Sequence, residues 1–164
     1  MKSILKQLWS SILPLTVIVI VPWLIEDNFS VEVSALSFAG IIFIIAGLLL
    51  MSITISMFIR IGKGTLAPWS PTQKLIVTGV YAHVRNPMIS GVLIVLLGES
   101  MMFGSVNILI WALAFFTINT FWFIMIEEPG LKKRFGEDYE EYKRNVPMWI
   151  PRRKPWIQPD HSQT

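Results

Sequence analysis

Two short polar segments of this largely apolar chain carry the side chains best suited to chemistry. Arg85, Asn86 and Pro87 come directly before one apolar stretch, and Glu127 and Glu128 close the next one. Proline is common at the first position of a helix, and a helix N-terminus beside an arginine favours an anion such as a carboxylate. If the two apolar stretches form a helical hairpin, the glutamates lie at the same end as the arginine. The pattern therefore predicts a site for a ligand with both anionic and cationic groups, at one face of a membrane.

Each of these residues also has an ordinary structural explanation. Two carboxylates at the C-terminal end of a helix face the negative end of the helix dipole, and Lys132, Lys133 and Arg134 follow closely enough to balance them. Arg85 taken alone fits a flanking residue that reaches toward lipid head groups. S-adenosylmethionine carries a carboxylate, an ammonium and ribose hydroxyls beside its sulfonium, and phospholipid head groups offer a similar set of charges. The residue chemistry alone leaves both ligands open.

The composition indicates a membrane protein. Of 164 residues, 53% are hydrophobic and only 15% are charged. Residues 35–59 contain no ionisable group, and a helix of this length crosses a hydrocarbon core of about 30 Å. The predicted fold is therefore an all-α integral membrane protein. Its expected transmembrane helices are residues 8–25, 35–59, 87–103 and 106–126.

The distribution of positive charge predicts the orientation. Lysine and arginine occur only at the N-terminus, in the 60–87 connection and in the C-terminal tail, whereas the first loop carries Glu26, Asp27 and Glu32. The positive-inside rule then places both termini in the cytoplasm, and a bacterial inner membrane is the expected location. The net charge of +3 is a sign of topology, and we expect no nucleic-acid partner. The oligomeric state stays open.

Two further observations concern the remaining polar residues. There is no cysteine, and His83 and His161 are the only histidines, so no metal site is predicted. Glu99 lies within the third expected helix. An acid inside a membrane helix is by default a functional hypothesis, and the alternative is that this helix ends before Glu99.

The C-terminal third is expected to be cytoplasmic. Pro129 and Gly130 are predicted to stop the fourth membrane helix, because the residue before a proline is pushed away from the helical region. Residues 131–144 then predict an amphipathic helix, and 156–164 a disordered tail. The chain is read as one compact domain, with membrane helices in 1–60 and a binding region in 61–155.

These segments, in this order, resemble the superfamily of isoprenylcysteine carboxyl methyltransferases and phospholipid N-methyltransferases, which are integral membrane enzymes. The resemblance runs from about residue 62 to 152. It rests on Gly79-Val80-Tyr81, Arg85-Asn86-Pro87, Glu127-Glu128, Phe135-Gly136, Tyr139, Tyr142 and Val146-Pro147-Met148-Trp149-Ile150-Pro151. It implies a methyltransferase that uses S-adenosylmethionine, with its cofactor pocket on the cytoplasmic side. The implied acceptor is a lipid-like or small hydrophobic molecule that enters from the bilayer and presents a carboxylate, a thiol or an amine.

The resemblance also implies the site residues. Arg85 and Glu128 are the implied catalytic residues. The implied cofactor-binding residues are Gly64, Tyr81, His83, Arg85, Asn86, Pro87, Glu127 and Glu128. The chain departs from the family pattern at three positions. Asn86 stands where a histidine is usual, Ile89 where tyrosine is frequent and Met148 where arginine is frequent.

Asn86 can donate and accept hydrogen bonds but cannot take up a proton near neutral pH. A carboxylate or thiolate acceptor would need no general base, whereas for an amine Glu128 or Glu127 would be the nearest proton acceptor. Two other classes of protein remain in competition. One is a non-catalytic membrane protein that binds lipid head groups or a partner, and the other is a membrane reductase with a nicotinamide cofactor. Cofactor binding would separate the three.

Overall fold

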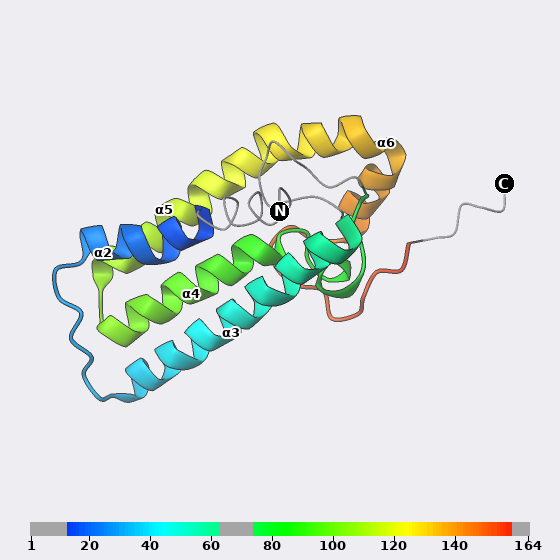
Figure 1. Cartoon of the computed structure of the whole chain (residues 1–164). Helices are drawn as coiled ribbons and strands as arrows, with labels where there is room; N and C mark the ends of the chain where they lie inside the picture. The colour runs from blue at the N-terminus through cyan, green and yellow to red at the C-terminus, as the bar shows by residue number, and fades with distance from the viewer. Residues whose placement is uncertain (1–12, 63–73, 159–164) are drawn as a thin grey trace, which may run out of the picture.

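The fold consists of long helices that short turns and loops connect at their ends. The computed structural model describes residues 13–62 and 74–158, and within these two ranges it contains helices and no strand. The predicted all-helical class is therefore confirmed for the described residues. The elements in chain order are η1 (Thr16–Ile20), α2 (Val21–Ile25), α3 (Ala35–Met57), η2 (Phe58–Gly62), η3 (Gly79–Ala82), α4 (Pro87–Phe103), α5 (Val106–Trp122), η4 (Phe123–Glu127) and α6 (Glu128–Asn145) (Figure 1).

Two of the helical segments are long and apolar enough to cross a bilayer by length and composition. They are Ala35–Ile61 and Val106–Asn145, and the segments Leu13–Ile25 and Pro87–Phe103 are shorter and also apolar. The large side chains on the outer faces of α3 and α5, such as Ile42 and Phe121, are mostly exposed. A water-soluble bundle buries its apolar faces, so this distribution agrees with helices that face lipid.

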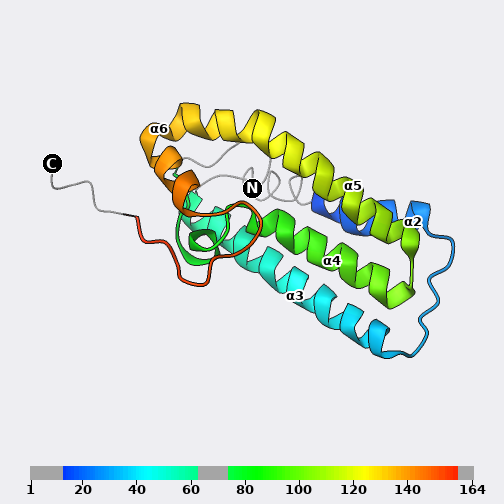
Figure 2. The ribbon, with the colours of Figure 1, turned by 180° about the vertical axis from the view of Figure 1, so that it is seen from behind.

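The hairpin of α3 and α4 is the most tightly packed part of the molecule. The two helices run antiparallel and side by side in both views (Figures 1 and 2). A Cβ atom at Gly47 would lie 2.7 Å from the carbonyl oxygen of Gly91, and one at Gly40 would lie 2.6 Å from that of Gly98. The glycines thus let the two backbones approach closely, as small residues do between membrane helices.

A single methyl group in this contact is expected to destabilise the fold. In Gly47→Ala, the new Cβ must displace backbone atoms of α4, because the carbonyl oxygen of Gly91 and the amide nitrogen of Val95 lie within 2.9 Å of it. We expect a loss of about 1–3 kcal/mol in unfolding free energy, measured by denaturation in mixed micelles. Gly130→Ala is the matched control, since nothing lies within 4 Å of its Cβ position. Equal stability of the two variants would contradict the close contact.

Serine side chains cap the N-terminal ends of α3 and α5. The hydroxyl of Ser34 accepts a hydrogen bond from the Ser37 amide at the start of α3, and the hydroxyl of Ser105 accepts one from the Ile108 amide at the start of α5. Ser105 in turn donates to the carboxylate of Glu26. The first loop is therefore tied to the turn between α4 and α5.

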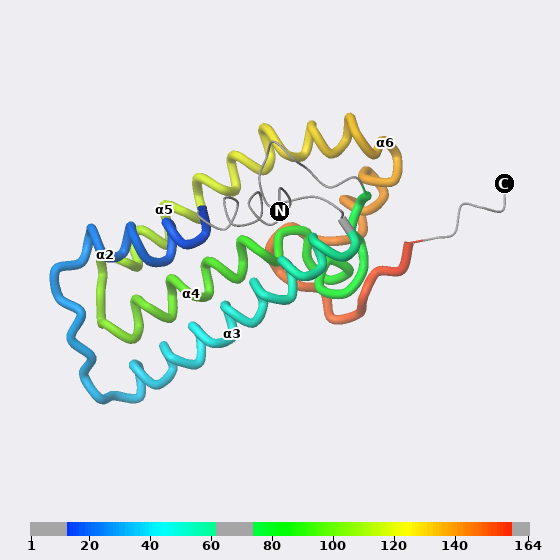
Figure 3. The backbone as a smooth tube through the Cα atoms, in the orientation of Figure 1, coloured from blue at the N-terminus to red at the C-terminus, as the bar shows by residue number. Residues whose placement is uncertain are grey.

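The prediction that Pro129 and Gly130 stop the fourth helix is wrong. Helical structure continues from Val106 to Asn145, through the π-helical turn η4. This wider turn places Pro129 in the first turn of α6, where a missing N–H and the proline ring are tolerated. The direction of the chain changes later, at Gly136, whose backbone has φ 56° and ψ −127° (Figure 3). Such a conformation is readily adopted by glycine.

The bend at Gly136 folds the second half of α6 back onto the bundle. Tyr139 and Tyr142 are almost fully buried and pack with Val77 and Val146. Trp156 was predicted to lie in a disordered tail. Instead its ring centre lies 5.7 Å from that of Tyr142, and its amide donates to the carbonyl of Ala82 at 2.9 Å. Residues 159–164 and residues 8–12 of the first expected span lie outside the described ranges.

Candidate active site

The structure brings Arg85 and Glu128 together in a buried ion pair. Arg85 lies just before α4, and its Nη1 donates to Oε1 of Glu128 at the start of α6, with both side chains only 8% exposed. Lys143 donates to the other carboxylate oxygen, Oε2, at 2.5 Å. The bend at Gly136 makes this third contact possible. A straight helix would separate residues 128 and 143 by about 22 Å.

Arg85 is held by further contacts around its guanidinium. Its Nε donates to the carbonyl of Val146 at 2.9 Å, and its Nη1 donates to the hydroxyl of Tyr139 at 3.2 Å. The guanidinium carbon also lies 5.8 Å from the ring centre of Phe123, within cation–π range. A single side chain therefore joins the start of α4 to the first turn of α6, to Tyr139 in its second half and to the residue that follows the helix.

The electrostatics of this cluster favour an anion. Two cations, Arg85 and Lys143, surround one carboxylate, so the group carries a net charge of +1. Burial opposes ionisation of Glu128, but the hydrogen bonds from Lys143 and Arg85 outweigh it and hold the pKa of this carboxyl below its usual value of 4.5. Burial, reinforced by the charge of Glu128, raises the pKa of Tyr139 to about 12, so its hydroxyl stays neutral.

The neighbouring predicted residues occupy different environments. Glu127 is exposed and forms none of the ion pairs found among the described residues, whereas Glu128 is turned inward. Pro87 is fully buried in the first turn of α4. Asn86 is 8% exposed, and within the described part of the chain its Nδ2 has no hydrogen-bond partner. A buried donor without a partner is costly, so Asn86 is a candidate for contact with a bound molecule.

Residues 146–157, the C-terminal strap, lie along the loop that carries Arg85. The carbonyl of Pro147 accepts from the Arg85 amide at 2.9 Å, and the Arg152 amide donates to the carbonyl of His83 at 3.0 Å. The ring nitrogen Nδ1 of His83 lies 2.8 Å from the carbonyl oxygen of Arg152. Because a carbonyl can only accept, this nitrogen carries the proton and the ring orientation is set by the strap.

Tyr81 is positioned by the same packing. Its carbonyl accepts a hydrogen bond from the hydroxyl of Tyr142 at 2.7 Å, and its ring lies 5.9 Å from that of Phe58 between ring centres. Burial, then the nearby Tyr142, raises the pKa of the Tyr81 hydroxyl. Tyr81 therefore anchors the loop through its packing contacts, and its hydroxyl is neutral.

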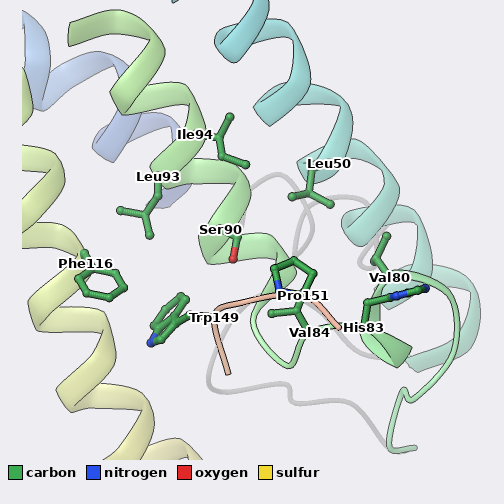
Figure 4. Close-up of a pocket in the computed structure, with 10 residues that line it drawn as sticks. All are labelled: Leu50, Val80, His83, Val84, Ser90, Leu93, Ile94, Phe116, Trp149 and Pro151. Atoms are coloured by element: carbon green, nitrogen blue, oxygen red, sulfur yellow. The ribbon is translucent and has the colours of Figure 1, made fainter. Parts of the chain in front are cut away.

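His83 and Val84 of this loop line an apolar crevice of about 440 Å³ (Figure 4). It runs across the first turns of α4, from the α3 side to the α5 side. On the α5 side, the ring centre of Trp149 from the strap lies 5.0 Å from that of Phe116. Trp149 Nε1 is buried and finds no partner among the described residues. The crevice is lined by Leu50, Val80, His83, Val84, Ser90, Leu93, Ile94, Phe116, Trp149 and Pro151.

The predicted site residues thus separate into groups. Arg85 and Glu128 are in direct contact, while Tyr81 and His83 lie in the loop that the C-terminal segments hold. Glu127 takes part in none of the ion pairs of the described residues, and Gly64 lies outside those residues. No group of three or more potential metal ligands occurs within 13–62 and 74–158. The sequence did not reveal Lys143, and the only local sign of the bend that brings it in is Gly136.

Residues 35–138 match the family model of phospholipid methyltransferases. The chain is 38% identical over 81 residues to a protein-S-isoprenylcysteine O-methyltransferase of Schizosaccharomyces pombe, covering 47% of this chain and 33% of that protein. It is also 38% identical over 82 residues to protein-S-isoprenylcysteine O-methyltransferase B of Arabidopsis thaliana, covering 48% of this chain and 40% of that protein.

The match therefore spans less than half the length of either relative. No solved structure matches the chain significantly. The family match covers α3, α4, α5 and the first part of α6, which are the elements that carry Arg85 and Glu128. The resemblance read from the motifs is confirmed, and the chain belongs to the phospholipid methyltransferase family.

Proposed function

We propose that this chain is a membrane methyltransferase that uses S-adenosylmethionine and transfers its methyl group to a lipid-like acceptor. The observation that carries the proposal is the cluster of Arg85, Glu128 and Lys143 beside an apolar crevice, in a chain of a methyltransferase family. A charged group could then bind near Arg85 and an apolar group near His83 and Val84, in the same short loop.

The charges of the cluster fit the cofactor. A net charge of +1 around Arg85 suits the carboxylate of a methionine moiety. The Nη2 group of the guanidinium would be its donor, because Nη1 and Nε already donate to protein oxygens. The exposed carboxylate of Glu127 is free of the cluster and suits the ammonium group. Asn86 offers its unpaired amide to a polar atom of the same ligand. When bound, S-adenosylmethionine would supply an electrophilic methyl group on its sulfonium, and the main task of these residues would be alignment.

The crevice supports a largely apolar acceptor. Its volume lies within the range of small-molecule sites, and its lining is mainly aliphatic and aromatic. The two relatives are named as O-methyltransferases, which favours an oxygen atom as the methyl acceptor. A carboxylate would require no general base. Removing a proton from an amine would need Glu127, because Glu128 is kept ionised by two hydrogen-bonded cations.

We also propose four membrane spans with both termini in the cytoplasm of a bacterial host. The chain lacks cysteine, so single cysteines report topology cleanly. Asp27→Cys is expected to react with a membrane-impermeant maleimide in intact cells, whereas Lys133→Cys is expected to react only after permeabilisation. Both positions are exposed in the structure. The reverse pattern of labelling would contradict the proposed orientation.

The function is tested by equilibrium binding of S-adenosylmethionine to the detergent-purified protein. We expect saturable binding that is lost in Glu127→Gln/Glu128→Gln, because the ammonium loses its carboxylate and Arg85 loses its buried partner. Glu137→Gln/Asp138→Asn is the matched control, since these acids are exposed on α6. Thermal unfolding shows whether each variant is folded.

Absence of binding to folded wild-type protein, with and without a lipid acceptor, would leave the head-group-binding alternative. A nicotinamide cofactor that displaced S-adenosylmethionine, or bound in its place, would favour the reductase. Competition between the two cofactors belongs in the same experiment.

A further inference from the structure

The C-terminal strap carries a surface that neither the ion-pair cluster nor the crevice uses. Arg153 and Lys154 are exposed at its outer edge. Two isoleucines flank them, and the side chains of Ile150 and Ile157 are 81% and 82% exposed. The segment 150–157 thus presents apolar, then cationic, then apolar side chains to the outside.

Among residues 13–62 and 74–158, no acidic side chain pairs with the positive charge of this edge. Residues 146–158 contain no aspartate or glutamate. None of the ion pairs found among the described residues involves Arg153 or Lys154. The other basic run of the tail differs, because Lys132 is paired with Glu140 at 2.9 Å and further acids follow on α6. The strap can therefore bind an anion through Arg153 and Lys154, whereas nearby acids already offset much of the positive charge of the basic run on α6.

The strap lies at the level where the helices leave the membrane in our proposed topology. It runs beneath the first turn of α4, and Trp149 reaches Phe116 on α5 (Figures 1 and 4). In the proposed topology Phe116 of α5 lies in the hydrocarbon region, so Trp149 reaches into the membrane and Ile150 is its neighbour in the chain. The same topology places Arg153 and Lys154, a few residues later, toward the head groups. Tryptophan and long basic side chains are typical of this boundary.

We propose that this edge of the strap binds anionic phospholipid head groups of the membrane in which the helices lie. A guanidinium and an ammonium match a lipid phosphate, while the two isoleucines contact the adjoining acyl region. The inference rests on the proposed membrane placement and does not depend on methyl transfer. Through the hydrogen bonds between the strap and residues 82–85, a bound lipid would also stabilise the loop that carries Arg85.

Native mass spectrometry of the detergent-purified chain, titrated with phosphatidylglycerol or phosphatidylcholine, tests the proposal. We expect the wild-type chain to retain phosphatidylglycerol preferentially. Each basic residue near an anionic surface contributes roughly fivefold to binding, so Arg153→Gln/Lys154→Gln is expected to lose about 25-fold in affinity. Lys132→Gln/Lys133→Gln removes the same charge from α6 and is expected to bind as the wild type does.

Several results would overturn the proposal. They are equal retention of the two lipids by the wild type, undiminished phosphatidylglycerol binding in Arg153→Gln/Lys154→Gln, or an equal loss in the α6 control. Displacement of the lipid by millimolar inorganic phosphate would point to a free anion as the ligand instead. Binding by the wild type should also fall as salt rises, a measurement that needs no variant. If the wild-type chain bound phosphatidylglycerol but not S-adenosylmethionine, the methyltransferase proposal would be rejected and the lipid proposal would stand.

Discussion

Arg85→Ala is expected to lose about 3–5 kcal/mol of unfolding free energy. The substitution removes the hydrogen bonds that the guanidinium makes to Glu128, Tyr139 and the carbonyl of Val146. Glu128 then remains 92% buried at its side chain with Lys143 as its remaining cation, and Lys143 is itself 41% exposed. A buried carboxylate that loses its principal partner retains the cost of desolvation. Denaturation in mixed micelles measures the loss.

Two further variants separate the causes of this effect. Arg144→Ala removes an exposed arginine of α6 that donates to the backbone carbonyl of Glu140, and we expect little change in stability. Arg85→Lys keeps the charge but cannot bond Glu128 and the Val146 carbonyl with one planar group, so an intermediate loss is expected. If Arg85→Ala were as stable as Arg144→Ala, the ion pair would contribute nothing to the fold.

Acid is expected to weaken the same contact. The pKa of Glu128 is lower in the folded protein than its ordinary value of 4.5, because the hydrogen bonds from Lys143 and Arg85 outweigh the effect of burial. The carboxylate therefore contributes its full stabilisation above about pH 4.5 and loses it as pH falls through the lower folded value. The melting temperature should accordingly drop steeply below pH 4.5, as followed by circular dichroism in detergent.

Glu128→Gln isolates this contribution. The variant is expected to have a lower melting temperature at neutral pH. Its melting temperature should also fall less steeply than that of the wild type as the pH drops below 4.5. A residual slope should remain, since the hydrogen bond from Lys132 also lowers the pKa of Glu140. That pair is exposed and contributes little. An acid limb as steep as that of the wild-type chain would show that another carboxyl controls acid unfolding.

Much of the helical framework could be predicted because its signals are local. The apolar stretches 35–59 and 87–103 predicted helices that the structure places at Ala35–Met57 and Pro87–Phe103. Pro87 at the start and Gly104 just beyond the end of α4 are helix boundary signals that need no tertiary contact. The predicted helix end at Pro129 was wrong because the π-helical turn η4 places this proline in the first turn of α6, where its ring is tolerated.

The candidate site was predictable only as a set of residue types. Arg85 and Glu128 were predicted to lie at one end of a hairpin, and they do. Which glutamate faces inward depends on the helix rotation after η4, and the sequence carries no sign of that rotation. The approach of Lys143 depends on the bend at Gly136, and the unpaired donor of Asn86 depends on burial in the packed structure.

The sequence by itself determined the helical class, the apolar spans, the distribution of charge and the family of this protein. Hydropathy, proline and glycine positions, and motif order are properties of neighbouring residues, so they can be read without coordinates. Only the tertiary structure decided that Arg85 is bound to Glu128, and that the C-terminal strap covers the loop before α4. Those contacts join residues far apart in the chain. Their formation depends on backbone bends and on burial, which arise when all the helices pack together.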